Sequence, residues 1–132
     1  MTALVDTSAF YALIDDRDPH HAAARAWLED CGPDIELVTH QYVVVETIAL
    51  VGRRFGPAAV RRFVDDLLPV AEVVWFDRST HAEALEALLA SGSRSVSLVD
   101  RVSFLVMRRR GIETAFAFDD DFAREGFLTA PV

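Results

Sequence analysis

Four acidic residues of this sequence stand at the ends or in the midst of apolar segments: Asp6, Glu46, Asp100 and Asp119. Asp6 ends an apolar run that begins with Leu4, and Asp119 ends the run TAFAF in the same way. Both runs are typical of buried strands, and ligands of open parallel sheets bind beyond the carboxyl ends of the strands. We therefore expect the carboxylates of Asp6 and Asp119 at a ligand-binding edge.

Glu46 and Asp100 fall in segments with helical spacing, and their neighbours on the same helix face are mostly apolar. The positions three and four residues from Glu46 are Tyr42, Val43, Ala49 and Leu50. The corresponding positions around Asp100 are Val96, Ser97, Ser103 and Phe104. Because residues at these offsets share one face of a helix, we predict that both acids project from buried faces. A carboxylate in such a place is costly unless it is paired, protonated or bound to a metal.

The four acids lie far apart along the chain, so pairing on one helix surface does not account for them. If they meet without a cation, mutual repulsion will force some of them to bind protons. Mg²⁺ or Mn²⁺ removes this repulsion, because hard cations prefer carboxylate and water oxygens. Taken alone, Asp119 could cap the turn DDDF and Asp100 could lie in a first helical turn, favoured by the helix dipole. The set taken together favours a metal site.

Short apolar runs alternate with helical segments along the chain. The expected strands cover residues 4–5, 35–38, 73–76, 114–118 and 127–130. The expected helices cover residues 9–14, 20–30, 39–54, 57 to about 68 and 96–110, with one more from a cap at Asp77 or Ser79 through Ala90 and a helical turn at 119–125. Ser8 is expected to cap the first helix. This alternation predicts a parallel sheet covered by helices on both faces.

The totals restrict the class of protein. At 132 residues the chain has the size of one domain, which we expect to span residues 1–132. The net charge of -8 argues against non-specific coating of nucleic acid, since proteins that do so are usually basic. Asp6 interrupts the first apolar stretch too early for a signal peptide, and no apolar run is long enough to span a membrane. The single cysteine, Cys31, suits a reducing cytoplasm.

Four motifs, in order, resemble the acidic signature of the PIN-domain nucleases, and the chain is most similar in size and layout to the VapC-type toxins of toxin–antitoxin pairs. The motifs are VDTSAF, VVVETIALV, SLVDRVSFLVM and AFAFDDDFAREGF, and together they span nearly the whole sequence. They identify Asp6, Glu46, Asp100 and Asp119 with the four acids of the family. Ala117 departs from the pattern, because relatives often carry threonine or serine there.

The resemblance implies a three-layer α/β/α sandwich around a mainly parallel sheet, and a metal-dependent endoribonuclease that hydrolyses RNA with activated water. Mg²⁺ would be the cofactor, with Mn²⁺ as a possible substitute, held by the four acids. Ser8 and Ser97 would orient carboxylates, and Asp121 is a possible auxiliary. The resemblance further implies a cytoplasmic homodimer that is neutralised by a small antitoxin protein, with no membrane association.

The sequence leaves two alternative hypotheses open. A metal-dependent phosphatase of the dehalogenase type also places aspartates at strand ends, but it needs a D-x-D pair after the first strand, where DTS supplies one aspartate. A catalytically silent module that binds RNA or protein would use the acids only for solubility. A mid-helix position such as that of Glu46 argues against it, because solubility requires exposed charge.

Overall fold

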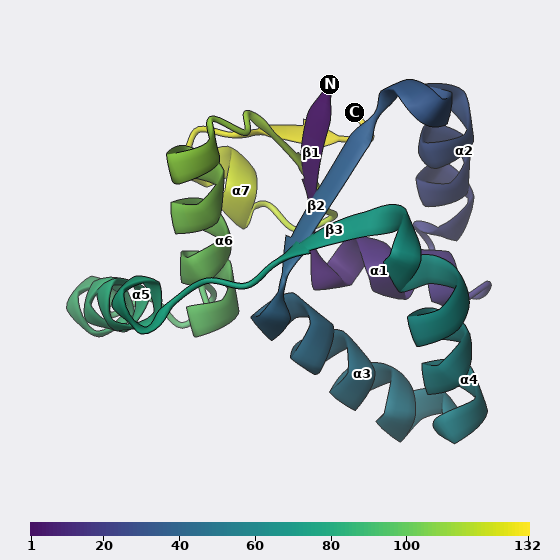
Figure 1. Cartoon of the computed structure of the whole chain (residues 1–132), viewed down its shortest axis with the longest axis horizontal. Coiled ribbons are helices and arrows are strands. Elements are labelled where there is room, and N and C mark those ends of the chain that lie inside the picture. The colour runs from purple at the N-terminus through teal and green to yellow at the C-terminus, as the bar shows by residue number, and fades with distance from the viewer.

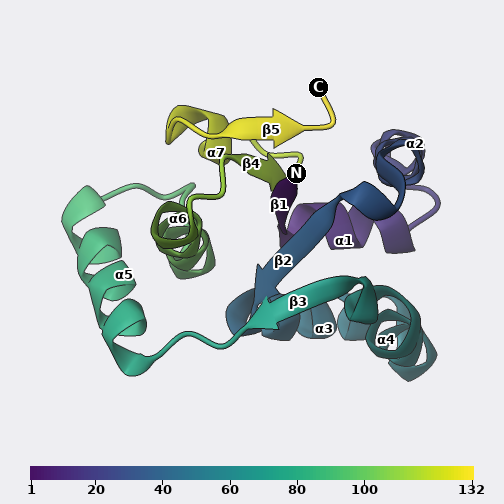
Figure 2. The ribbon, with the colours of Figure 1, turned by 45° about the horizontal axis from the view of Figure 1, so that its top comes forward.

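The strands form one five-stranded sheet in the order β3-β2-β1-β4-β5, in which every neighbouring pair is parallel (Figures 1 and 2). The computed structural model describes residues 1–132. The strands are β1 (Thr2–Val5), β2 (Glu36–His40), β3 (Ala71–Val74), β4 (Thr114–Phe116) and β5 (Leu128–Ala130). All five predicted strands are present, with shifted ends.

Seven α-helices accompany the sheet. They are α1 (Thr7–Ile14), α2 (His21–Cys31), α3 (Gln41–Phe55), α4 (Pro57–Arg62), α5 (Arg78–Ser91), α6 (Leu98–Arg110) and α7 (Asp121–Arg124). The helix expected from Pro57 to about residue 68 is shorter than predicted, because α4 passes into a π-helical turn at Phe63–Leu67 and a 3-10 turn at Leu68–Val70. Asp77 caps α5 by accepting a hydrogen bond from the Thr80 N–H, 3.0 Å. None of the helices is both long and apolar enough to cross a membrane.

The sheet separates two apolar cores, as the alternation of side chains along β1 shows. Leu4 packs with α5, α6 and α7, whereas Ala3 and Val5 pack with α1, α2 and α3. Figures 1 and 2 show these two groups of helices on opposite sides of the sheet. The fold is therefore a three-layer α/β/α sandwich, as predicted.

The strand order reverses beside β1. The chain goes outward from β1 through β2 to β3, and then crosses back to place β4 on the other side of β1. Val5, the last residue of β1, lies opposite Phe116, the last residue of β4. The carboxyl ends of β1 and β4 thus flank the switch point, which is where open parallel sheets bind ligands. Asp6 follows one of these strands directly, and Asp119 follows the other after two residues.

Two strand ends differ from the prediction because of particular hydrogen bonds. The helix expected from Thr39 begins at Gln41, since Thr39 pairs with Val73 in the sheet and its hydroxyl donates to the Val5 carbonyl, 3.0 Å. The strand expected to reach Phe118 ends at Phe116, since the Phe118 N–H donates to the Ser8 hydroxyl instead of to a strand, 3.1 Å.

Candidate metal centre

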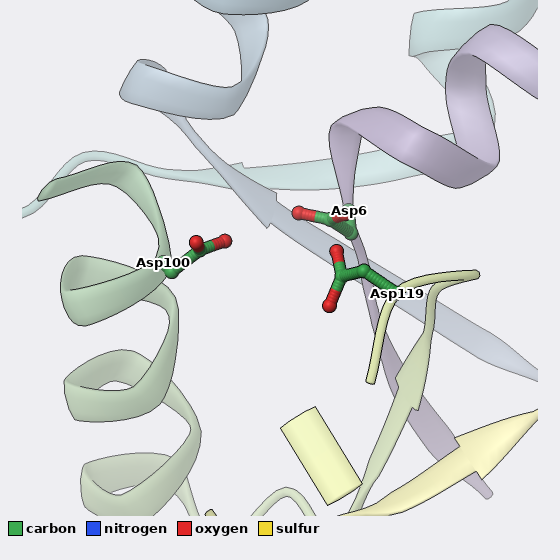
Figure 3. Close-up of side chains that lie close together, drawn as sticks. All are labelled: Asp6, Asp100 and Asp119. Carbon is green, nitrogen blue, oxygen red and sulfur yellow. The ribbon is translucent and has the colours of Figure 1, made fainter. Parts of the chain in front are cut away.

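Three of the four predicted acids meet at the switch point: Asp6, Asp100 and Asp119. One carboxylate oxygen from each lies within 4.8 Å of the other two. Figure 3 shows the three side chains directed toward one another, from the end of β1, the first turn of α6 and the loop after β4. Residues from the beginning, the last third and the end of the chain thus share one site.

Asp6 is both a member of the cluster and the N-cap of α1. Its side chain is 4% exposed, and it caps α1 by accepting hydrogen bonds from the Ser8 N–H (3.2 Å) and the Ser8 hydroxyl (2.6 Å). The expectation that Ser8 caps α1 was wrong. Asp6 has the extended backbone of a cap, and Ser8 lies within the first turn. The Ser8 hydroxyl also accepts from the Phe118 N–H, so it ties the first acid to the loop that carries Asp119.

Asp100 is oriented by a reciprocal pair of hydrogen bonds with Ser97, the N-cap of α6. The Ser97 hydroxyl accepts from the Asp100 N–H (3.1 Å), and the Asp100 carboxylate accepts from the Ser97 N–H (2.9 Å). This capping box uses one carboxylate oxygen and aims the side chain at the start of the helix. The Asp100 carboxylate also contributes one oxygen to the group of three acids.

Asp119 is oriented by the backbone of the following turn. The Asp121 N–H donates to the Asp119 carboxylate, 3.1 Å. The Asp121 side chain itself is buried and accepts hydrogen bonds from Arg124 (3.4 Å) and the Ser95 hydroxyl (3.5 Å). It does not belong to the cluster of Asp6, Asp100 and Asp119. Asp121 therefore contacts the candidate site through its main chain, while its carboxylate holds α7 in place.

Glu46 does not project from a buried face, contrary to the sequence-based expectation. The buried residues of α3 are Val43, Thr47 and Val51, a stripe with a spacing of four, and Glu46 lies one position off this stripe and is exposed. Two neighbours used in the prediction mislead, because Ala49 is exposed and Leu50 is only half-buried. Glu46 is not among the three acids that cluster.

Burial and mutual repulsion make the cluster reluctant to carry three negative charges. Burial, and after it the charges of Asp119 and Asp100, raises the pKa of Asp6 from 3.8 to about 7 against the opposing hydrogen bonds of Ser8. Burial and the charge of Asp119 raise the pKa of Asp100 to about 6, and burial also raises that of Asp119. Three crowded carboxylate oxygens, with no cationic side chain among them, form a donor set that fits a divalent cation.

His40 is a buried residue next to this centre that the sequence reading did not single out. It is the last residue of β2, the strand next to β1, and its side chain is completely buried. Burial lowers the pKa of His40 to about 3, so the ring is neutral near neutral pH. A polar residue at the end of an apolar run was the available signal.

Comparisons with known proteins agree with this geometry. A model of the PIN domain matches residues 3–128. The chain is 38% identical to the 23S rRNA-specific endonuclease VapC20 of Mycobacterium tuberculosis over 94% of each chain. The crystal structure of that protein, described as a toxin that cleaves the sarcin-ricin loop, superposes with a TM-score of 0.86 and 33% identity over 97% of each chain.

Two more distant structures share the fold. FitAcB from Neisseria gonorrhoeae superposes with a TM-score of 0.70 at 15% identity, over 98% of this chain and 96% of that one. VapBC2 from Rickettsia felis, bound to a DNA fragment from its promoter, superposes with a TM-score of 0.71 at 14% identity, over 98% and 97%. Together with the closer matches, these findings confirm the resemblance to PIN-domain nucleases and VapC toxins predicted from the sequence.

Proposed function

This chain belongs to the PIN domain family, and on that premise we propose that it is an endoribonuclease whose carboxylates Asp6, Asp100 and Asp119 hold Mg²⁺, with Mn²⁺ as a substitute. The observation that carries the proposal is the convergence of the three acids, with raised pKa values, at the switch point of the sheet. A buried site that disfavours its own negative charge gains stability when a cation binds.

The chain's residues determine what kind of attack the site performs. A bound divalent cation supplies positive charge that stabilises the phosphoryl oxygens and lowers the pKa of an attacking water. Ser8 is the nearest hydroxyl to Asp6, but it donates to Asp6 and accepts from the Phe118 N–H, so it is not free to attack a phosphodiester. Water is therefore the nucleophile, and Ser8 and Ser97 keep the carboxylates pointing at the cation.

Glu46 has a different place in the proposed site from the other three acids. It lies in the second turn of α3, the helix that starts where β2 ends, and so on the same edge of the sheet. Its side chain is exposed and accepts or donates no hydrogen bond within the protein that would hold it away from a substrate. We assign it to the cation or its water in the RNA-bound state. Asp121 is left as a support for Asp119.

The proposed substrate is RNA, and by similarity to the mycobacterial relative it is ribosomal RNA. The proposed partner is a small antitoxin that covers the acidic site, as in toxin–antitoxin pairs, and a homodimer is the proposed assembly in the cytoplasm, where ribosomes are. Exposed apolar side chains such as Trp75 (76%) and Leu89 (76%) provide surface for such contacts. With a net charge of -8, the protein depends on cations to bring phosphate to its carboxylates.

The phosphatase reading is disfavoured by the structure of the first strand end. In that class a second acid follows two residues after the first, whereas Ser8 occupies this position and is fully engaged with Asp6 and Phe118. No second carboxylate is available there to act as a nucleophile's partner.

The test is cleavage of purified ribosomal RNA by the pure chain with Mn²⁺, with Mg²⁺ and with a chelator. We expect cleavage in both metals, none in chelator, and none with Asp6→Asn in any condition. Asp16→Asn is the matched control, because Asp16 is exposed and its replacement changes the net charge equally. Cleavage that persists in chelator, or in Asp6→Asn, would refute the assignment.

A further inference from the structure

We propose that His40 and Ser103 form a positioning pair that fixes Asp100 relative to Asp6. This inference rests on the proposed function, since it concerns the geometry of the same three carboxylates. Neither residue belongs to the cluster, and both side chains are completely buried.

The pair joins two elements of the site through a buried hydrogen bond. The His40 Nε2 lies 2.8 Å from the Ser103 hydroxyl, on α6. The His40 Nδ1 accepts from the Val43 N–H (3.4 Å) and so caps α3. The Ser103 hydroxyl lies 3.1 Å from the Val99 carbonyl, immediately before Asp100.

The direction of these hydrogen bonds follows from the donors available. Ser103 has one hydroxyl proton, which goes to the Val99 carbonyl, because a carbonyl only accepts. The proton between Ser103 and His40 must then belong to the Nε2 of the ring. Nδ1 is left unprotonated, as its contact with the Val43 N–H requires. A neutral imidazole with its proton on Nε2 satisfies every contact, and burial of the ring holds it neutral.

The register of the sheet explains why this link bears on the site. Leu4 lies opposite Val38 in the parallel pair of β1 and β2, so continuing two residues along both strands brings His40 level with Asp6. The link therefore runs from the level of one ligand to the helical turn that carries another. The other contacts of α6 with the sheet are the apolar ones of Val102, Val106 and Met107, which have no directional preference, and an ion pair of Arg110 with Glu72 on β3. Arg110 is the last residue of α6, at the end of the helix opposite Asp100.

The other end of the link is itself anchored. The Gln41 side-chain amide donates to the Phe76 carbonyl and accepts from the Phe76 N–H, both at 3.0 Å. The start of α3 is thus fixed to the chain leaving β3, independently of His40. The buried bond between His40 and Ser103 consequently acts on the placement of α6 and of Asp100.

Two substitutions break the link in different ways. His40→Asn supplies a side-chain oxygen that can cap α3 in place of the His40 Nδ1, but asparagine is too short to reach Ser103. Ser103→Ala removes the acceptor and leaves a good helix former in α6. We expect each to weaken binding of Mn²⁺ about tenfold, the lower end for groups that orient metal ligands. The double variant should be no weaker than either single variant, because both remove the same bond.

Binding is measured by titration calorimetry and by the electron paramagnetic resonance signal of free Mn²⁺, on the whole chain. Val106→Ala is the control. Val106 is buried on α6, one turn beyond Ser103 as seen from Asp100, and it packs in the apolar core. It should destabilise the fold while leaving Mn²⁺ affinity unchanged. Nitrogen-15 spectra should show a protonated Nε2 on His40, with its resonance altered in Ser103→Ala.

The outcomes separate this inference from the proposed function. Loss of Mn²⁺ binding in Asp6→Asn supports the metal centre whatever the behaviour of His40. Wild-type affinity in a folded His40→Asn or Ser103→Ala variant overturns the positioning role alone. Equal weakening by Val106→Ala also overturns it, because general loosening of α6 would then explain the effect. If His40→Asn does not fold, Ser103→Ala decides the question.

Discussion

Replacement of Asp6 by asparagine should stabilise the metal-free fold while destroying the metal site. In the folded chain the pKa of Asp6 is raised from 3.8 to about 7, chiefly by burial. The unfolded chain ionises near pH 4 and the folded chain only near pH 7, so the penalty is absent below pH 4 and complete above pH 7. About three pKa units at about 1.4 kcal/mol each give an upper bound of about 4 kcal/mol.

Asparagine keeps the favourable part of the environment. Its side-chain oxygen can still accept from the N–H and hydroxyl of Ser8, and asparagine caps helices as well as aspartate does. Its amide protons face the carboxylates of Asp100 and Asp119, which accept them. We therefore expect Asp6→Asn to raise the free energy of unfolding by roughly 2–4 kcal/mol at pH 8, with almost no gain at pH 4.

The assay is urea denaturation followed by circular dichroism at both pH values, in chelator. Asp16→Asn provides the control for net charge and should change stability by less than about 0.5 kcal/mol, since Asp16 is exposed. Mn²⁺ should then stabilise the wild type but not Asp6→Asn. A variant that is less stable than wild type at pH 8, or equally stabilised at pH 4 and pH 8, would show that Asp6 does not bear an uncompensated charge.

Three other predictions follow from the contacts of the site. The pKa values of Asp6 and Asp100 are raised to about 7 and about 6, so thermal melts in chelator should show stability falling between pH 4 and pH 7. Saturating Mn²⁺ should reduce this fall, and a rise in stability over the same range would contradict the prediction. Ser8→Ala should lower the free energy of unfolding by about 1–3 kcal/mol in urea titrations and weaken Mn²⁺ binding, because the Phe118 N–H loses its acceptor. An unchanged urea midpoint and Mn²⁺ affinity would show that the Ser8 hydroxyl does not tie Asp6 to the loop of Asp119. Glu46→Gln should leave stability within about 0.5 kcal/mol and reduce RNA cleavage at least about tenfold, and full cleavage would remove Glu46 from the site.

The parts of the fold that follow from local patterns could be predicted from the sequence. Short apolar runs ending at Asp6 and Asp119 identified β1 and β4, and their shared edge followed from the rule for parallel sheets. Strand ends were harder to predict, because Thr39 and Phe118 are placed by hydrogen bonds to residues far away in sequence. The spacing of apolar residues along the chain carries no information about such distant hydrogen-bond partners.

In the site, too, local arrangements could be predicted from the sequence and long-range contacts could not. Asp100 could be placed in a first helical turn, where its capping box with Ser97 is a local arrangement. The exposure of Glu46 depends on which stripe of α3 meets the sheet, and Val43, Thr47 and Val51 form that stripe only in the packed structure. His40, at the end of β2, gave only one weak local signal. Its partner Ser103 lies on α6, far away in the sequence, so the contact between them could not be predicted.

The position of β1 between β2 and β4 also determines when this enzyme can begin to work. Its partner Thr114–Phe116 lies near the other end of the chain, so during translation one side of β1 stays unpaired until most of the protein has been made. Long-range parallel pairing of this kind forms late in folding. The group of three acids is then completed only after Asp119 has been synthesised, so the site cannot act on RNA before most of the chain exists.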